Sequence, residues 1–238
     1  MSGPPAAPQL SVVVPAYGEG RRIGGSVLAL RAALGDDVEL IVVDDGSPDA
    51  TGAAAKEAGA EVIRLPVNRG KGAAVRTGVL AAHGAMVVFT DADLSYPPSQ
   101  IERVRAELER GADVVVGSRR HVGTTTLVRA GRLREISGRV FNLFTRLVLP
   151  RPFGDTQCGL KGFRQEAARA IFQRATVDGF AFDVEVLWLA SHLGYTVVEV
   201  PVELDSAAES TVRLPREVTR MLRDLVRIKR RADLGGYG

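Results

Sequence analysis

This sequence is short of cysteine, of aromatic residues and of long apolar runs, and each shortage excludes something. Cys158 is the single cysteine in 238 residues, so the chain cannot form an internal disulfide, and a reducing, cytoplasmic setting is expected. Aromatic residues make up only 5% of the chain, which leaves Val, Leu, Ile and Ala to build most of the core. No run of about 18 apolar residues occurs, so we expect no membrane-spanning helix in these residues. Residues 1–9 lack the basic-then-apolar pattern of a signal peptide and are expected to form a loose tail.

Two phosphate-binding fingerprints are also missing. The G-x-x-x-x-G-K-[ST] loop does not occur, and no G-x-G-x-x-G follows the first apolar strand, which argues against a dinucleotide-dependent dehydrogenase. The three histidines, His83, His121 and His192, are scattered through the sequence, and we interpret them as structural or surface residues.

Charge is distributed unevenly, although the net charge is only +3. Residues 119–151 contain eight arginines against Glu135 alone, and residues 215–231 contain seven basic residues against Glu217 and Asp224. The rest of the chain is therefore acidic. Such asymmetry favours an anionic partner such as a phosphate or a lipid headgroup, and the alternative is a solvated basic surface. A nucleic acid is disfavoured, because the basic segments lack interleaved aromatic side chains.

Short apolar runs alternate with segments of helical periodicity in the first half of the chain. Strands are expected at 10–15, 38–43, 61–65, in the run before Asp91 and at 113–117, with helices at 21–34, after 48, at 73–82 and near 98–110. The second half predicts helices at 133–149, 166–172, 183–193 and 215–231 and a strand at 196–202. This alternation predicts an α/β fold, with a mostly parallel sheet flanked by helices and a basic amphipathic helix at the end.

Acidic residues follow two of the expected strands. Asp44 and Asp45 follow the second strand, and Asp91 and Asp93 follow the fourth. Side chains two residues apart in an extended segment point the same way, so Asp91 and Asp93 can face one Mg²⁺ or Mn²⁺ ion. Asp44 or Asp45 would then hydrogen-bond a ribose or a base, as acids do at the ends of such strands. A single Asp at a strand end is more often a turn or helix cap, but two clusters at one sheet edge favour a site.

A glycine-rich turn supplies the complementary charge. Asn68–Gly72 precedes a helix, so its backbone N–H groups, the start of the helix and the Lys71 ammonium all favour an anion. By itself the segment is equally compatible with a solvated turn.

The order of these motifs resembles the family 2 glycosyltransferases of GT-A fold, a Rossmann-like architecture. The motifs are Val12–Tyr17, Val43–Ser47, Asn68–Gly72, Asp91–Asp93 and Gly117–Arg119. Two later segments, Asp155–Lys161 and Phe180–Glu185, are similar to the dolichyl-phosphate glucosyltransferase branch, and the polyprenyl-phosphate mannosyltransferases share most of the first half. The resemblance covers residues 10–231.

The resemblance implies transfer of a hexose, with inversion, from a nucleotide sugar to a polyprenyl or dolichyl phosphate; UDP-glucose is the expected donor, and GDP stays open. It implies that Asp91 and Asp93 hold Mg²⁺ or Mn²⁺. The nucleotide-sugar pocket would comprise Pro15, Ala16, Tyr17, Glu19, Asp44, Asp45, Gly46, Ser47, Lys71, Gly72, Asp91 and Ala92. The acceptor phosphate would contact Arg119, Arg132, Arg134 and Gln157, and the catalytic residues would be Asp93, Asp155, Asp183 and Arg119.

Two positions depart from the family pattern. Gly18 stands where an Asn is usual after the Tyr, and Ser95 stands where some mannosyltransferase relatives have a metal-binding Gln. With Ser95 in that place, we expect metal to bind poorly alone and much better when a nucleotide diphosphate supplies further oxygens.

The predicted organisation is a tail at 1–9, a glycosyltransferase domain at 10–214 and a basic amphipathic extension at 215–238. Within the domain, residues 10–118 form the nucleotide-binding half and 119–214 the acceptor half. The helix at 215–231 either lies on an anionic membrane surface, which would place the protein peripherally on a cytoplasmic face, or packs its apolar side on the sheet. Two alternative functions stay open. They are the same chemistry on a soluble alcohol or natural-product acceptor, with Asp155 or Asp183 as base, and a non-catalytic nucleotide-binding protein at the membrane surface.

Overall fold

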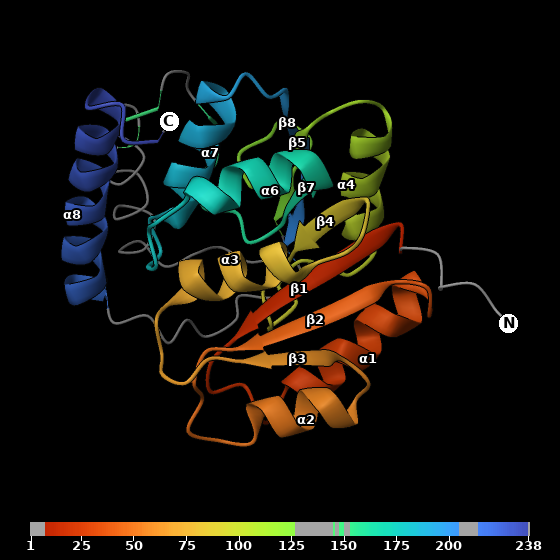
Figure 1. Cartoon of the computed structure of the whole chain (residues 1–238). Helices are drawn as coiled ribbons and strands as arrows, with labels where there is room; N and C mark the ends of the chain where they lie inside the picture. The colour runs from red at the N-terminus through yellow and green to blue at the C-terminus, as the bar shows by residue number, and fades with distance from the viewer. Residues whose placement is uncertain (1–7, 127–144, 146–147, 150–152, 205–213, 238) are drawn as a thin grey trace, which may run out of the picture.

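A seven-stranded sheet forms the centre of the protein, with helices packed on both faces (Figure 1). The structure is a computed structural model that describes residues 8–126, 145, 148–149, 153–204 and 214–237. The strands are β1 Leu10–Ala16, β2 Glu39–Asp44, β3 Glu61–Arg64, β4 Met86–Phe89, β5 Val114–Ser118, β6 Thr125–Thr126, β7 Lys161–Arg164, β8 Val197–Pro201 and β9 Glu203–Leu204. The helices are α1 Ile23–Leu34, α2 Thr51–Glu57, α3 Lys71–Ala81, α4 Gln100–Glu109, α6 Gln165–Arg174, α7 Phe182–His192 and α8 Leu214–Asp233. The predicted helix at 133–149 lies outside the described residues, apart from residues 145, 148 and 149.

The sheet has the order β3-β2-β1-β4-β7-β5-β8, and all its neighbours are parallel except those of β7. The expected mostly parallel sheet is therefore confirmed. Strand β7 runs antiparallel between β4 and β5, pairing Phe89 with Lys161 and Val116 with Lys161. Because β7 is antiparallel, the segment that leads into it lies at the edge where β4 and β5 end. This places residues 155–160 beside the acidic turn that follows β4.

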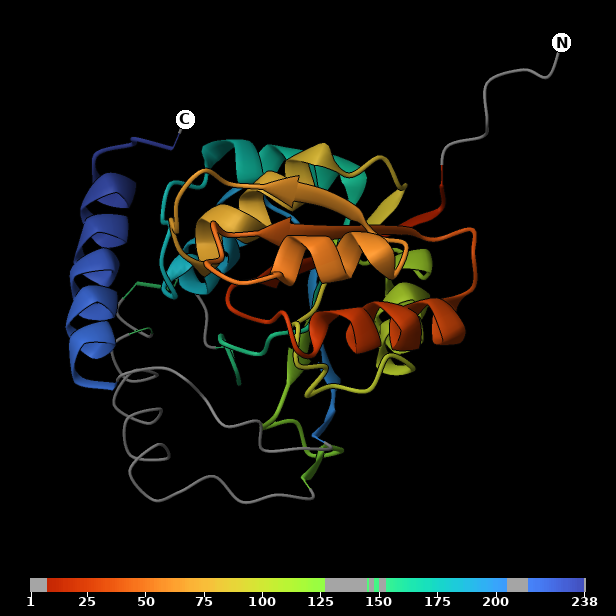
Figure 2. The ribbon, with the colours of Figure 1, turned by 90° about the horizontal axis from the view of Figure 1, so that it is seen from below.

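Two apolar layers cover the two faces of the sheet, and Figure 2 shows the helices on either side of it. One layer contains buried side chains of α1, α2 and α4, and the other contains those of α3, α6 and α7. Aliphatic residues dominate both layers. The scarce aromatic residues gather in the second, where Phe89 lies 5.8 Å from Phe182 and 6.2 Å from Phe163 between ring centres.

Helix α8 stands at one side of the molecule (Figures 1 and 2) and packs its apolar face on the protein. Leu225 and Ile228 are 4% and 0% exposed and belong to the same cluster as the buried side chains of α7. The sequence allowed the apolar side of this helix to face a membrane or to pack on the protein. In the structure it packs on the protein. In the described ranges no helix has both the length and the apolar composition that crossing a bilayer requires.

Candidate active site

The turn after β4 presents Asp91 and Asp93 at the carboxyl edge of the sheet. The Ser26 hydroxyl of α1 donates a hydrogen bond to the Ala92 carbonyl at 2.6 Å, and the Ser95 backbone N–H donates to Asp93 Oδ1 at 3.0 Å. The first bond joins the turn to α1, and the second closes the turn on itself. The two predicted metal ligands are thus held in one short segment next to the sheet.

Two lysine–aspartate ion pairs lie at this turn. Lys71 Nζ lies 2.5 Å from Asp91 Oδ1, and Lys161 Nζ lies 2.6 Å from Asp183 Oδ1. Lys161 is fully buried and also donates to the Cys158 carbonyl at 2.6 Å. Three segments distant in sequence, at the starts of α3, β7 and α7, therefore meet at the end of β4.

Burial and charge act in opposite directions on the pKa values of this cluster. Burial lowers the pKa of Lys71, but the carboxylates of Asp91, Asp183 and Asp93 outweigh it and leave the pKa raised. Burial is also the largest influence on Asp183, and it raises the pKa of this carboxyl against the opposing charges of Lys161 and Lys71. Lys71 therefore carries its positive charge at neutral pH.

The turn fits a hard divalent cation that brings further oxygen ligands with it. Asp91 and Asp93 offer carboxylate oxygens, which Mg²⁺ and Mn²⁺ favour. A Cβ at Gly159 would fall 2.0 Å from Asp91 Oδ2, so the absence of a side chain there makes room for the carboxylate. Among the residues that the structure describes, no group of three or more His, Cys, Asp and Glu could hold a metal ion. Mg²⁺ takes six ligands, so oxygens of a bound diphosphate would have to complete the shell.

Asp45, at the end of β2, holds the glycine-rich turn that precedes α3. Its Oδ1 and Oδ2 accept hydrogen bonds from the backbone N–H groups of Arg69 and Gly70, each at 2.8 Å. Gly46 lies so close that a Cβ there would meet the Asn68 nitrogen at 2.7 Å. The turn is thus docked against the end of β2, as an approach of both segments to one ligand requires.

The same turn is held from its other side by residues 177–178. Gly72 has no room for a side chain, since a Cβ would fall 2.4 Å from the Val177 carbonyl oxygen. Asp178 accepts a bond from the Ala73 N–H at 3.2 Å and pairs with Arg76 at 2.5 Å. The position of Lys71 therefore depends on the loop before α7.

Asp44 is buried, and its carboxylate is bonded within the protein. Oδ1 accepts the Ser47 N–H at 2.9 Å, and Oδ2 accepts Arg64 Nη1 at 2.8 Å. This carboxylate braces the loop after β2. The contacts with base and ribose that the resemblance implies for Asp44 and Asp45 stay predictions.

The end of β1 supplies the rest of the predicted nucleotide pocket. Pro15 and Ala16 are buried in the sheet, whereas Tyr17 is 51% exposed and available to a ligand. The Glu19 N–H donates to Thr51 Oγ1 at 2.8 Å. Burial raises the pKa of the Glu19 carboxyl, with Arg22 lowering it and Asp93 raising it further. The negative charge of Asp93 in the acidic turn therefore contributes to the raised pKa of Glu19.

Gly18 has a backbone reason for replacing the usual Asn. Its φ is +70°, in the left-handed region that Gly and Asn both tolerate, and its N–H donates to Ser47 Oγ at 3.0 Å. Gly18 therefore suits the backbone conformation at this position.

The predicted acceptor residues form a second group, built on an ion pair. Arg119 Nε and Nη2 bind Asp155 Oδ2 and Oδ1 at 2.6 and 2.9 Å, and the Gln157 N–H donates to Asp155 Oδ1 at 3.1 Å. Burial raises the pKa of Asp155, but Arg119 outweighs burial and holds the pKa below its usual value. Asp155 is thus ionised and orients Arg119. Arg132 and Arg134 lie outside the described residues.

Sequence reasoning included Gly159 and Lys161 in the motif Asp155–Lys161 but predicted no site role for either. A lysine inside the apolar stretch Leu160–Phe163 was the available signal, because such a lysine needs a buried carboxylate partner. Nothing local marks Gly159, whose importance arises from the antiparallel entry of β7 beside Asp91.

Comparisons with known proteins identify the family and the fold. The model of the family described as Glycosyl transferase family 2 matches residues 11–172. A dolichyl-phosphate beta-glucosyltransferase of Dictyostelium discoideum is 32% identical, over 95% of this chain and 75% of that protein. One of Drosophila melanogaster is 36% identical, over 82% of this chain and 66% of that protein.

A solved structure shares the fold over almost the whole chain. The glucosyl-3-phosphoglycerate synthase of Mycobacterium tuberculosis, crystallised with Mn²⁺, UDP and glucosyl-3-phosphoglycerate, superposes with a TM-score of 0.71 at 25% identity. The match covers 94% of this chain and 78% of that one. The GT-A fold expected from the motifs is thereby confirmed.

Proposed function

Because this chain belongs to glycosyl transferase family 2 and is a glycosyltransferase, we propose that it transfers glucose from UDP-glucose to a polyprenyl phosphate of the dolichyl type, with inversion. The observation that carries the proposal is the acidic turn of Asp91 and Asp93, with Lys71 beside it. This arrangement suits a nucleotide diphosphate, and the names of the relatives supply the sugar and the lipid phosphate.

In the proposed reaction, Asp91 and Asp93 would hold Mg²⁺ or Mn²⁺ beside the donor diphosphate. When bound, the cation screens the diphosphate and stabilises the nucleoside diphosphate as it leaves. Lys71 adds a positive charge at the same place, and the end of β1 and the loop after β2 enclose the nucleoside. The support for metal use is the carboxylate pair of this chain and the Mn²⁺ in the crystals of the structural relative.

Arg119 has the chemistry to orient the acceptor. A guanidinium fork binds phosphate oxygens, and Asp155 holds this one through Nε and Nη2. A phosphate monoester is already ionised near neutral pH, so its oxygen can attack the anomeric carbon without a general base. The lowered pKa of Asp155 makes that carboxylate a weak base, which agrees with an orienting role.

A matrix of donors and acceptors tests the proposal. Purified protein with Mn²⁺ is incubated with UDP-glucose or GDP-mannose, and with dolichyl phosphate, dolichol or 3-phosphoglycerate, and glycosylated product is measured. The expected result is glucosyl lipid phosphate from UDP-glucose and dolichyl phosphate. Product with 3-phosphoglycerate alone would replace the lipid with a soluble acceptor, as in the name of the structural relative. UDP binding without turnover on any acceptor would indicate a non-catalytic nucleotide-binding protein.

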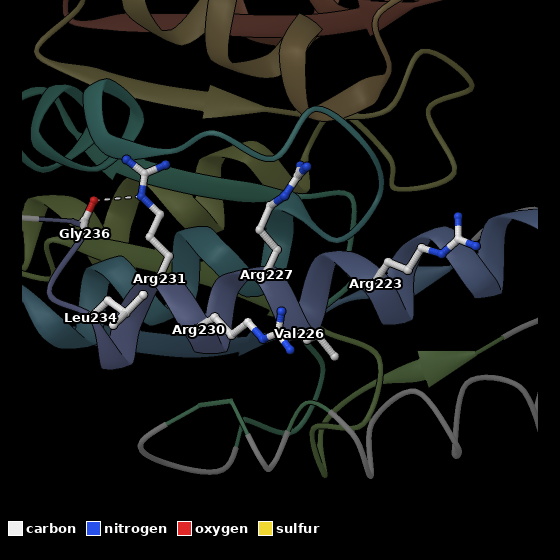
Figure 3. A pocket seen from close by; sticks show the side chains of 7 residues that line it. All are labelled: Arg223, Val226, Arg227, Arg230, Arg231, Leu234 and Gly236. Atoms are coloured by element: carbon white, nitrogen blue, oxygen red, sulfur yellow. Dashed lines mark hydrogen bonds between the residues drawn. The ribbon is translucent and has the colours of Figure 1, made fainter.

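The proposed acceptor lies in a membrane, and the outer face of α8 has the charge to meet it on the cytoplasmic side. Arg223, Arg227, Arg230 and Arg231 line a shallow hollow of about 430 Å³ together with Val226 and Leu234 (Figure 3). Val226 and Leu234 are 53% and 85% exposed. Arginines around exposed apolar side chains favour an anionic headgroup surface.

Co-sedimentation with vesicles tests the membrane contact. The double variant Arg223→Gln with Arg230→Gln should lose binding to phosphatidylserine vesicles, and phosphatidylcholine vesicles should bind neither protein. The matched control is Arg105→Gln with Arg110→Gln, which removes the same charge from α4 and its C-cap. Equal loss in both double variants would mean that net charge, not the α8 face, governs binding.

A further inference from the structure

Lys71 already occupies the carboxylate that the metal needs. Its ammonium lies 2.5 Å from Asp91 Oδ1, and the two side chains are only 20% and 30% exposed. The other oxygen, Oδ2, faces the backbone of Gly159, where even a Cβ would be 2.0 Å away. A cation that approaches Asp91 must therefore compete with Lys71 for the carboxylate.

A second carboxylate stands within electrostatic reach of the same ammonium. The residues next to the two are in contact, since a Cβ at Gly72 would fall 2.7 Å from the Phe182 Cβ. The charges of Asp183 and Asp91 both act on Lys71. Asp183 is held in place by fully buried Lys161, which binds Oδ1 at 2.6 Å and is itself fixed by the Cys158 carbonyl. Asp183 is thus a fixed second carboxylate toward which the flexible stem of Lys71 can turn.

We propose that Lys71 is an internal counter-ion that blocks Asp91 until a nucleotide diphosphate binds, and that it then moves toward Asp183 and the diphosphate. The inference rests on the proposed function in one respect, the identity of the diphosphate. It assigns to Lys71 and Asp183 the coupling of metal affinity to nucleotide binding. The proposal predicts that removing Lys71 strengthens metal binding. If Lys71 merely lined the pocket, its removal would weaken binding.

Mn²⁺ affinity, measured by the electron paramagnetic resonance signal of free Mn²⁺, tests the proposal without turnover. Without nucleotide, Lys71→Met should bind Mn²⁺ about three- to tenfold more tightly than the unaltered protein, because a partly buried competing ion pair is gone. Lys71→Arg retains the charge and should stay near the unaltered value. Lys56→Met removes a lysine from the exposed side of α2 and is the matched control for net charge.

The second arm adds UDP. UDP should tighten Mn²⁺ binding strongly in the unaltered protein and much less in Lys71→Met, whose Asp91 is already accessible. Asp183→Asn should also show a smaller gain with UDP, because Lys71 then lacks its second partner. Lys71→Gln, which keeps a polar side chain of similar length, keeps the test open if Lys71→Met fails to fold, and it should likewise bind Mn²⁺ more tightly without nucleotide. Unchanged or weaker Mn²⁺ binding by Lys71→Met without nucleotide would overturn the proposal, as would an unreduced gain with UDP in Asp183→Asn.

This outcome is separable from the proposed activity. The nucleotide-free titration uses neither sugar nor acceptor, so it can succeed even if dolichyl phosphate proves not to be the acceptor. Conversely, the unaltered protein could transfer glucose while Lys71→Met shows an unchanged Mn²⁺ affinity. That result would support the proposed function and reject the proposed role of Lys71.

Discussion

Replacing Lys161 with methionine leaves the buried Asp183 carboxylate without the cation that pairs with it. The Lys161 side chain is fully buried, that of Asp183 is 6% exposed, and their charged atoms are 2.6 Å apart. Removing one member of a buried ion pair costs about 3–5 kcal/mol of unfolding free energy, because the remaining charge is left uncompensated. The charge of Lys71 also acts on Asp183 and compensates in part. We therefore expect a value of about 3 kcal/mol, at the lower end of that range.

Urea unfolding followed by tryptophan fluorescence measures this cost. Trp188 is the single tryptophan, and its ring lies 5.0 Å from that of Tyr237 in the folded protein. The double variant Lys161→Met with Asp183→Asn should recover much of the loss, because both charges are then gone. A cost below about 1 kcal/mol for Lys161→Met, or additive effects of the two changes, would refute the reasoning.

The cost should also depend on pH, and its sign follows from the Asp183 carboxyl. Burial already raises the pKa of Asp183, and Lys161→Met removes the main opposing charge. Above a pH of about 4 the unfolded variant releases this proton while the folded variant still holds it. The variant should therefore lose stability, relative to the unaltered protein, as pH rises from about 4 to the raised pKa of the folded state. A difference that is constant over this range would contradict the assignment.

Two further substitutions test other contacts. Gly159→Ala places a methyl group against Asp91 and should weaken Mn²⁺–UDP binding about tenfold, the equivalent of a modest overpacking cost; isothermal titration calorimetry measures it, and Gly25→Ala, whose Cβ meets open space, should bind normally. Tyr237→Phe removes a 2.7 Å hydrogen bond to buried Glu185 and should cost about 1 kcal/mol, or about 2–4 °C in melting temperature by scanning calorimetry; an unchanged melting temperature would mean that the bond contributes nothing.

Much of the fold follows from local pattern. The apolar runs before Pro15, Asp44 and Asp91 could be recognised as buried strands because their residues are apolar on both faces. The antiparallel direction of β7 could not be recognised from local pattern. It depends on how the chain returns to the sheet between β4 and β5, which is a matter of tertiary structure. That direction brings Gly159 and Lys161 to the acidic turn.

The functional pattern was likewise only partly visible. The spacing of Asp91 and Asp93 predicted a shared direction on the premise of an extended segment, but the structure places Ala92 and Asp93 in a turn after β4. Lys71 predicted an anion site. The ion pair between Lys71 and Asp91 joins two segments that meet only when α3 packs beside β4, so no local pattern predicted it. The docking of Asp45 on the turn before α3 depends in the same way on tertiary contact.

By itself, the sequence determined the family, the α/β class and the set of chemically able residues, because these depend on residue type and spacing along the chain. Only the tertiary structure decided how their charges are paired. Asp155 is bound to Arg119, Asp183 is bound to Lys161, and Asp91 is bound to Lys71. A charge in a low-dielectric interior must find a partner in space, and folding, rather than sequence proximity, determines which partner that is.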